Sequence, residues 1–336
     1  MAGPMDAVDF LAVVSRPTFP NGSGTAGDYY NLRALINRRS DWNAVVLELN
    51  SRSTTVEWDG RDLIVRQEGV RPVSVNSVRT ALFLPICLEV EETLLCPLNQ
   101  GGSWPRFETE QWRSVSAAFE DRLSNLADRT GGRCLNRPDR VRVTNNKMIQ
   151  FEQLAAAGFS LPPAVVSGVW PQGTPLGQDP VLVAKNVSEG GWKSEDEFSP
   201  ARLVQPETPT DPWPTIWQRP IVSDLELRCY VTGDRVTVVE LTRDPAVLDV
   251  RSTNGGQPLG RIVDVPDRWE ALLLAMTRCL GLDYAVIDAI PSGDELHVLE
   301  VNANGVWWFL PPDIAAALEA RFHTWLESEI DGRPSA

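Results

Sequence analysis

The chain has 336 residues, 43% of them hydrophobic, and a formal net charge of −14 at pH 7. This length predicts roughly two domains or one large multi-lobed protein with a proper core. The negative charge disfavours nucleic acid as a partner. No apolar run approaches the thickness of a bilayer, and the N-terminal residues lack a basic stretch followed by an apolar one. We therefore expect neither a membrane anchor nor a signal peptide.

Histidine and cysteine are too scarce for several kinds of site. The only two histidines are His297 and His323, which excludes a His-rich metal site and argues against a Ser-His-Asp triad. We expect His297 to be a packed or surface strand residue and His323 to face solvent from a terminal helix. The five cysteines are scattered without a CxxC pair, as in a cytoplasmic protein with reduced thiols. Any chemistry must therefore use carboxylates, lysine, arginine and a metal.

The N-terminal third reads as alternating strands and helices. In chain order the pattern predicts a strand at 10–14, a helix at 28–39, a strand at 44–49, a hairpin of 54–58 with 63–67, and a helix at 108–130. The glycine-rich stretch at 21–27 is not a Walker loop, because no Gly-Lys-Ser/Thr follows it. We interpret it as a flexible loop. These elements predict an open α/β domain over residues 1–135.

The rest of the chain predicts two further lobes, over 136–220 and 221–336. A connector at 134–139 marks the first boundary. After it we expect a helix at 145–157, strands at 164–166 and 181–185, a mobile polar loop at 188–213, strands at 215–217, 225–231 and 235–241, and helices at 269–280 and 312–330. Both lobes are thus expected to be α+β.

Near the C-terminus, two apolar strands at 284–290 and 297–302 are joined by a turn at 291–294. Strand alternation places Asp288 on one face, and on the second strand it places Glu300 and Asn302 on one face with Val298. By the same alternation, Leu299 and its neighbours at 297 and 301 point the other way.

Two carboxylates that lie side by side among core residues are costly unless a cation neutralises them. Asp288, Glu300 and Asn302 offer only oxygen ligands, which suit Mg²⁺, an ion that usually also binds phosphates. The hairpin therefore predicts a nucleotide and magnesium site. The alternative interpretation is a β-hairpin that carries surface acids.

Further polar residues lie where a nucleotide site needs them. Lys147 opens a helix, and Lys185 ends an apolar strand where its head group needs an anion or water. The other candidates are the glycine-rich loop Ser188, Glu189, Gly190 and Gly191, the linker Gln218, Arg219 and Ile221, the strand pair Glu226 and Arg228, and the loop residue Arg251. The alternatives stay open: Lys185 and Lys147 as solvent-facing lysines, Arg251 as an ordinary loop arginine, and Trp307-Trp308 as plain core rather than a substrate pocket.

In this order the residues resemble the ATP-grasp superfamily over about 140–312. Asp288 followed by Glu300 and Asn302 resembles its magnesium triad. The resemblance also implies that Lys147 and Lys185 are its two nucleotide-binding lysines, 188–191 its phosphate-covering loop, 218–221 its adenine hinge, Glu226 its ribose ligand, and Arg228 and Arg251 its catalytic arginines. It implies an ATP-grasp fold in which the two later lobes enclose ATP.

The ending Glu300-Val-Asn-Ala-Asn-Gly-Val-Trp-Trp308 is most similar to that of graspetide synthetases, which close ester or amide rings in ribosomally made peptides. Ala303 stands where that group usually has proline. The resemblance implies an ATP- and Mg²⁺-dependent ligase that forms an acyl phosphate and acts on a precursor peptide. A homodimer is expected on the same ground. The alternatives are a ligase for free amino acids or for a small metabolite or protein terminus, and a non-catalytic ATP-binding protein.

Overall fold

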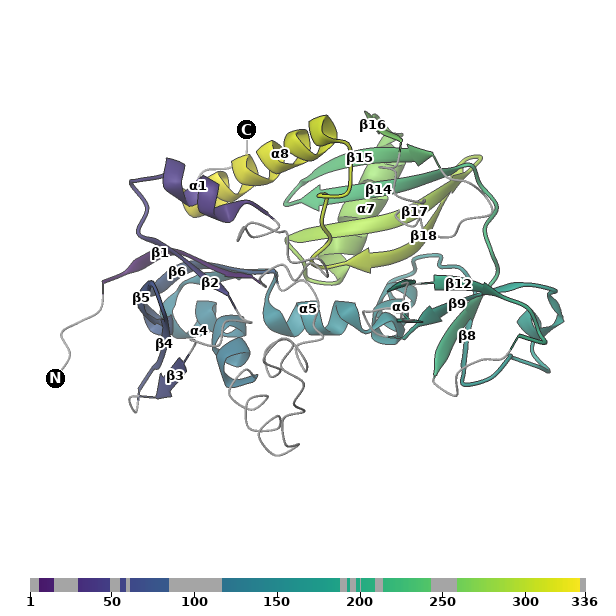
Figure 1. Cartoon of the computed structure of the whole chain (residues 1–336), viewed down its shortest axis with the longest axis horizontal. Helices are drawn as coiled ribbons and strands as arrows, with labels where there is room; N and C mark the ends of the chain where they lie inside the picture. The colour runs from purple at the N-terminus through teal and green to yellow at the C-terminus, as the bar shows by residue number, and fades with distance from the viewer. Residues whose placement is uncertain are drawn as a thin grey trace. The chain divides into compact units, whose positions relative to one another are not determined.

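The computed structural model describes residues 6–14, 30–48, 55–58, 61–84, 117–187, 192–193, 198–199, 201–208, 214–242 and 259–332. It divides into two compact units (Figure 1). Unit 1 combines Met1–Arg142 with Glu319–Ala336, and unit 2 is Val143–Leu318. Within the described residues, no helix is both long and apolar enough to cross a bilayer.

Unit 1 contains a parallel sheet in the order β2-β1-β6-β7. Its strands are β1 (Val8–Val14), β2 (Ala44–Glu48), β6 (Val78–Leu84) and β7 (Arg133–Leu135). All three pairings are parallel. Nearly every residue of β1 is buried, as expected for a central strand covered on both faces. The predicted open α/β arrangement is confirmed, although β6 and β7 were not predicted.

A second, antiparallel sheet in unit 1 has the order β3-β4-β5. It consists of β3 (Thr55–Trp58), β4 (Leu63–Gln67) and β5 (Val70–Ser74), and a short 3-10 turn, η1 (Val75–Ser77), leads into β6. The pairing of β3 with β4 confirms the predicted hairpin. Buried Asp62 accepts a hydrogen bond from the Leu63 backbone at 2.7 Å and fixes the start of β4.

The helices of unit 1 differ from their predicted lengths. Helix α1 (Leu32–Arg38) is shorter than expected. Of the helix predicted at 108–130, residues 108–116 lie outside the described residues, and the rest is helical over 117–124 and again in α4 (Leu126–Thr130). Gly131 ends α4 in the left-handed conformation, with φ of 73°, which glycine adopts without steric cost.

The prediction that His323 faces solvent is wrong. It lies on α8 (Pro312–Ile330), whose bounds were predicted correctly, but only 3% of its surface is exposed. Arg38 approaches its Nδ1 at 3.0 Å, and its Nε2 lies 2.8 Å from the Tyr30 carbonyl oxygen. Because arginine only donates and a carbonyl only accepts, these contacts fix the neutral tautomer with the proton on Nε2. His323 is therefore a structural residue of unit 1.

The predicted connector at 134–139 contains the end of β7 and the start of α5 (Pro138–Asn145), with only Asn136 and Arg137 between them. Proline suits the first helical position, where its missing N–H would have no intrahelical partner. Helix α6 (Lys147–Ala156) follows immediately. The Asn146 side chain caps it by accepting hydrogen bonds from the backbone N–H groups of Met148 and Ile149.

Unit 2 contains an antiparallel sheet in the order β12-β9-β13-β8. Its strands are β8 (Ala164–Ser167), β9 (Leu182–Asn186), β12 (Ala201–Val204) and β13 (Thr215–Gln218), and a short 3-10 turn, η2 (Leu176–Gln178), precedes β9. Trp170, Leu176 and Trp217 belong to the core on one face of this sheet. The prediction that 188–213 is a mobile loop is wrong in part, because that stretch contains β12 and the short pair β10 (Trp192–Lys193) and β11 (Phe198–Ser199).

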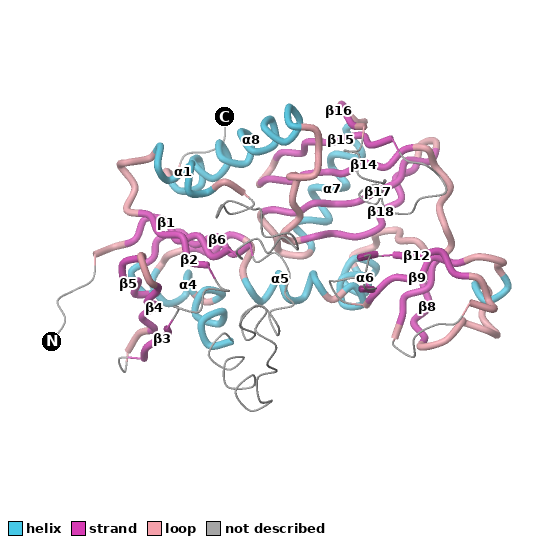
Figure 2. The backbone as a smooth tube through the Cα atoms, viewed as in Figure 1, coloured by secondary structure: helices cyan, strands magenta, loops and turns pink. Residues whose placement is uncertain are grey.

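The larger sheet of unit 2 is antiparallel in the order β16-β15-β14-β17-β18 (Figure 2). Its strands are β14 (Leu225–Thr232), β15 (Arg235–Thr242), β16 (Gly260–Val263), β17 (Tyr284–Ser292) and β18 (Glu295–Asn302). Helix α7 (Asp267–Cys279) packs against β14, β15 and β17. The predicted division of the chain at 135 and 220 stays a proposal.

The hairpin of β17 and β18 contains a β-bulge that strand alternation does not reveal. Asp288 pairs with Glu300, whereas its neighbour Ala289 pairs with Val298, so Leu299 is the extra residue. A bulge shifts the alternation by one residue. The prediction that Val298 shares the face of Glu300, with Leu299 on the opposite face, is therefore wrong. Val298 is buried with Val301 on the other face, and Leu299 lines the same pocket as Ile290.

Candidate active site

The three residues predicted as a metal triad lie together at the end of the β17–β18 hairpin. Asp288 and Glu300 are directly opposite each other in the register, and Asn302 is opposite Val286. The Asn302 Nδ2 donates to Asp288 Oδ2 and to Glu300 Oε1, both at 3.2 Å. The predicted common face is confirmed for these three residues. Their role as metal ligands stays a prediction.

Each carboxylate of this pair also contacts a cation. Arg228 Nη1 lies 2.7 Å from Asp288 Oδ1, and Lys147 Nζ lies 3.0 Å from Glu300 Oε2. Arg228 and Asp288 are only 4% and 6% exposed. Buried carboxylates require such compensation. The two cations belong to separate elements, β14 and α6, so the fold brings distant parts of the chain to one cluster.

Arg228 is held on three sides. Besides Asp288, its Nε donates to the Tyr230 hydroxyl at 3.1 Å and its Nη2 to the Val306 carbonyl at 3.3 Å. The Tyr230 hydroxyl donates to the same carbonyl at 3.1 Å. Burial by itself lowers the pKa of Arg228, but the Asp288 carboxylate together with the Tyr230 and Tyr284 hydroxyls outweighs it, and the pKa is raised. Arg228 is therefore a fixed positive charge.

Lys185 reaches the same cluster from β9. Burial lowers the pKa of its ammonium below the usual 10.5, an effect that Lys147 reinforces and that Glu300, Asp288 and Glu226 oppose. Among the described residues, no carboxylate forms an ion pair with Lys185. A buried lysine with a lowered pKa is poised to accept an anion. The interpretation of Lys185 as a solvent-reaching lysine is wrong, since only 8% of it is exposed.

Lys147 owes its position to the start of α6. Its backbone N–H donates to the Val187 carbonyl at 2.9 Å, which ties the helix N-terminus to the end of β9. Lys147 is 7% exposed, so it is not a solvent-facing lysine either. The two lysines therefore lie beside the carboxylate pair, and the buried Glu226 of β14 opposes the lowering of the Lys185 pKa.

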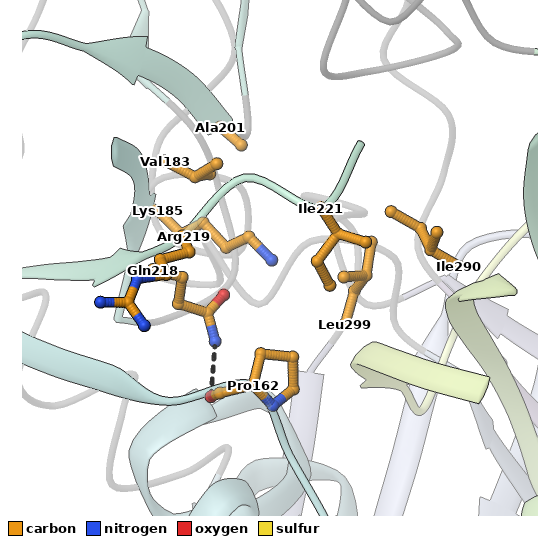
Figure 3. A pocket seen from close by; sticks show the side chains of 9 residues that line it. All are labelled: Pro162, Val183, Lys185, Ala201, Gln218, Arg219, Ile221, Ile290 and Leu299. Carbon is orange, nitrogen blue, oxygen red and sulfur yellow. Dashed lines mark hydrogen bonds between the residues drawn. The ribbon is translucent and has the colours of Figure 1, made fainter. Parts of the chain in front are cut away.

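A pocket lies beside this cluster, between the two sheets of unit 2 (Figure 3). It is lined by Pro162, Val183, Lys185, Ala201, Gln218, Arg219, Ile221, Ile290 and Leu299. Pockets for small molecules are mostly apolar with a few polar groups, and this lining has the same character. Most of its walls are aliphatic, and the Lys185 side chain extends along one side.

Gln218 and its neighbours form one end of the pocket. The Gln218 Nε2 donates to the Pro162 carbonyl at 3.3 Å, so its amide oxygen is directed towards Lys185 (Figure 3). The Arg219 guanidinium is instead paired with Asp179 at 2.8 Å. Of the predicted hinge, Gln218, Arg219 and Ile221 thus line the pocket together. The charged end of Arg219 is bonded to Asp179.

The residues that follow β18 pack closely against β17. A Cβ added to Gly305 would lie 2.4 Å from the Cβ of Val286, so only glycine fits there. Trp307 is 3% exposed and forms an edge contact with Tyr230, with 6.2 Å between ring centroids. Trp308 is 52% exposed. The core interpretation therefore holds for Trp307 only.

Five predicted site residues lie outside the described residues. They are Ser188, Glu189, Gly190, Gly191 and Arg251. Two other residues at the site were missed, Tyr230 and Gln150. Gln150 is 1% exposed and bonds the backbone of Val301. A polar residue on the face of α6 that also buries Leu154 was the signal that could have revealed it.

The donor set fits a hard divalent ion. Within the described residues, no group of three or more His, Cys, Asp or Glu could hold a metal, so a site here must use the Asn302 amide besides the Asp288 and Glu300 carboxylates. As placed, Asn302 turns its NH₂ group to both carboxylates. Rotation of this amide by a half-turn would present its oxygen instead, which completes three oxygen ligands of the kind Mg²⁺ accepts.

No family model matches the chain, but curated proteins and solved structures resemble it. A probable alpha-L-glutamate ligase of Mannheimia succiniciproducens is 25% identical over 235 residues, 68% of this chain and 77% of that protein. Another, from Histophilus somni, is 27% identical over 209 residues, 60% of this chain and 67% of that protein.

Solved structures resemble nearly the whole chain. The macrocyclase MdnC of Microcystis aeruginosa MRC, bound with the precursor peptide MdnA, has a TM-score of 0.69 and 17% identity, over 95% of this chain and 99% of that one. A RiPP-associated ATP-grasp ligase of Chryseobacterium gregarium, in complex with ADP and a leader and core peptide, has a TM-score of 0.66 and 16% identity, over 98% of both chains. A RimK domain ATP-grasp protein of Sphaerobacter thermophilus has a TM-score of 0.52 and 13% identity, over 95% of this chain and 99% of that one. The chain therefore has the ATP-grasp fold, and the proteins it resembles are ATP-grasp ligases and macrocyclases.

Proposed function

We propose that the chain is an ATP- and Mg²⁺-dependent ligase that activates a carboxylate as an acyl phosphate and acts on a ribosomally made peptide. The observation that carries the proposal is the cluster of Asp288, Glu300 and Asn302 with Lys147 and Lys185 beside an apolar pocket. Such a cluster suits a nucleotide whose base lies in the pocket and whose phosphates meet the charges.

The charges of the cluster support a polyphosphate ligand that arrives with its metal. Its three carboxylates, Asp288, Glu300 and Glu226, are matched by three cations, Lys147, Lys185 and Arg228. ATP adds negative charge to this balance, so Mg²⁺ must enter with it. When bound, Mg²⁺ would neutralise the β- and γ-phosphates, held by Asp288, Glu300 and Asn302.

The chain's own residues would act by position and charge. Lys185 and Lys147 bind phosphate oxygens, and Gln218 and Ile221 bound the base. A substrate carboxylate attacks the γ-phosphorus, ADP leaves, and an acyl phosphate forms. An amine or hydroxyl then attacks the acyl carbon, phosphate leaves, and the nucleophile loses its proton. The fixed charge of Arg228 stabilises this site electrostatically, which is the main contribution of proteins to phosphoryl transfer.

The peptide substrate is supported by MdnC, which is described as bound with a precursor peptide, and by the Chryseobacterium ligase, which is described in complex with a leader and core peptide. The second candidate, a ligase for free amino acids, is favoured by the curated relatives named as glutamate ligases. The roles of Ser188–Gly191 and Arg251 in phosphate contact, the homodimer and the cytoplasmic location stay predictions.

The test is ADP release from Mg·ATP, with the Glu300→Gln variant as blank. One reaction contains the twenty free amino acids. The other contains synthetic peptides that combine Asp or Glu with Lys, Ser or Thr. Peptide-dependent ADP release, with loss of one water per bond by mass spectrometry, is the expected result. Release with free amino acids alone would establish the second candidate. Hydroxylamine added to either reaction traps an acyl phosphate as a hydroxamate. ATP binding without ADP release or hydroxamate would contradict a ligase.

A further inference from the structure

Helix α6 contacts β18 at two successive positions. Lys147 makes the ion pair with Glu300, and Gln150 bonds the backbone of the next residue, Val301. Residues three apart in a helix lie on the same face, so one face of α6 meets consecutive residues of the strand. The second contact has no part in the chemistry described above.

The contact of Gln150 resembles the pairing of one strand with another. Its Nε2 donates to the Val301 carbonyl at 2.7 Å, and the Val301 N–H donates to its Oε1 at 3.0 Å. The second Nε2 hydrogen goes to the Thr144 carbonyl at 2.7 Å. The amide orientation is fixed, because the Val301 N–H only donates and its carbonyl only accepts. Gln150 is thus fully satisfied and almost completely buried.

This contact supports β18 at the edge of its sheet. In the described sheet β18 is the last strand, so one side of its backbone has no strand neighbour, and an edge position leaves its N–H and C=O groups unpaired. The bulge at Leu299 lies two residues away. A slip of one residue there would exchange the two faces of the strand.

Val301 lies between Glu300 and Asn302, so the position of its backbone sets where both flanking side chains point. We propose that Gln150 is a positioning residue that holds β18 in the register which brings Glu300 and Asn302 to Asp288 for metal binding. This inference rests on the proposed function. Gln150 touches neither nucleotide nor metal, and it acts only through the backbone of Val301.

Two substitutions at this position separate shape from hydrogen bonding. Gln150→Met keeps the length of the side chain and removes every hydrogen bond. Gln150→Glu keeps an acceptor for the Val301 N–H but, when ionised, faces the Val301 and Thr144 carbonyls without a donor. Gln153→Met is the matched control, because it makes the same chemical change one turn later on α6, at a half-buried side chain.

The experiment measures binding of Mn²⁺ to the full chain in the presence of ADP by electron paramagnetic resonance, together with hydrogen exchange of peptides covering 296–304. We expect Gln150→Met to raise the Mn²⁺ dissociation constant about tenfold or more, equal to about 1.4 kcal/mol, and to speed exchange over 296–304. Gln153→Met should change neither. If Gln150→Met does not fold, Gln150→Glu gives the same readout, with the same direction expected.

Two results would overturn the inference, and they are distinguishable. If the wild-type protein binds Mn·ADP and the folded Gln150 variants bind it equally well, Gln150 only supports structure, and the proposed function stands. If the wild-type protein does not bind Mn·ADP at all, the proposed function fails and the inference fails with it.

Discussion

Replacement of Arg228 by methionine should destabilise unit 2 strongly, because it leaves a buried carboxylate without its cation. Asp288 is 6% exposed and lies 2.7 Å from the guanidinium. After the change Asp288 still accepts a hydrogen bond from Asn302 Nδ2 at 3.2 Å, but this amide carries no charge. The Val306 carbonyl keeps the Tyr230 hydroxyl, so the loss concentrates on Asp288.

Removal of one partner of a buried ion pair typically costs about 3–5 kcal/mol, and we expect a decrease of this size in the free energy of unfolding. Asp288→Asn should also destabilise, since it isolates Arg228. The double variant should lose at least about 3 kcal/mol less than the sum of the two single changes, because no isolated charge remains.

The assay is urea unfolding at pH 7, followed by tryptophan fluorescence. Arg261→Met is the matched control: it removes an arginine from an ion pair of 2.8 Å with Glu240, but one whose arginine side chain is 73% exposed. Exposed pairs contribute about 0–1 kcal/mol, so the control should be nearly neutral. Equal effects of Arg228→Met and Arg261→Met, or strict additivity with Asp288→Asn, would refute the reasoning.

Three further predictions concern single residues of unit 2. Glu300→Gln should abolish ADP release. It should also weaken Mn²⁺ binding by more than the roughly 10–100-fold that is typical when a residue only orients metal ligands. If the variant keeps the wild-type affinity for Mn²⁺, Glu300 is not a metal ligand. Because the folded-state pKa of Lys185 is lowered, its charge destabilises the fold, and stability should rise with pH between that pKa and 10.5. Bound triphosphate should restore the positive charge of Lys185, so ATP binding in this pH range should be accompanied by proton uptake. Calorimetry of ATP binding in buffers of different ionisation enthalpy measures this uptake, and Lys185→Met should abolish it. Gly305→Ala should cost about 1–3 kcal/mol through overpacking against the Cβ and methyl groups of Val286, measured by urea unfolding. Val286→Gly removes that Cβ, so the double variant should lose less stability than the sum of the two single changes; strict additivity would show that the backbone, not the contact, requires glycine.

The sequence indicated correctly that Asp288, Glu300 and Asn302 lie together, because the evidence for their common face is local. Two carboxylates and an amide interrupt apolar strands at Asp288, Glu300 and Asn302, and a hairpin brings the strands together wherever its turn lies. The bulge at Leu299 could not be seen in the same way. Both Val298 and Leu299 are apolar, so strict alternation and a shifted alternation fit the residues equally well, and only the pairing decides.

The other wrong predictions concern residues whose structure depends on tertiary contacts. Residues 201–204 lie in a proline-rich polar stretch without periodicity, and they become strand β12 because β9 offers them an edge to pair with. His323 looks like a surface residue of an amphipathic helix, and it is buried by the Arg38 side chain and the Tyr30 carbonyl, both far away in sequence. Propensity and periodicity contain no information about such partners.

The charged partners of the triad could be predicted from the sequence only in part. Lys147 and Lys185 were singled out from their positions at element ends, but their convergence on Glu300 depends on how α6 and β9 meet the larger sheet. Gln150 was missed because a single glutamine on a helix resembles a surface residue until its buried position is known.

The most direct test of the central claim is a crystal structure of the protein with Mn²⁺ and the non-hydrolysable analogue AMPPNP, using the anomalous signal of manganese. We expect an anomalous peak within about 2.2 Å of oxygens from Asp288, Glu300 and Asn302, with the Asn302 amide turned and the adenine beside Gln218 and Ile221. Nucleotide bound elsewhere, or manganese absent while Asn302 still donates to both carboxylates, would contradict the claim that this cluster is the ATP and metal site.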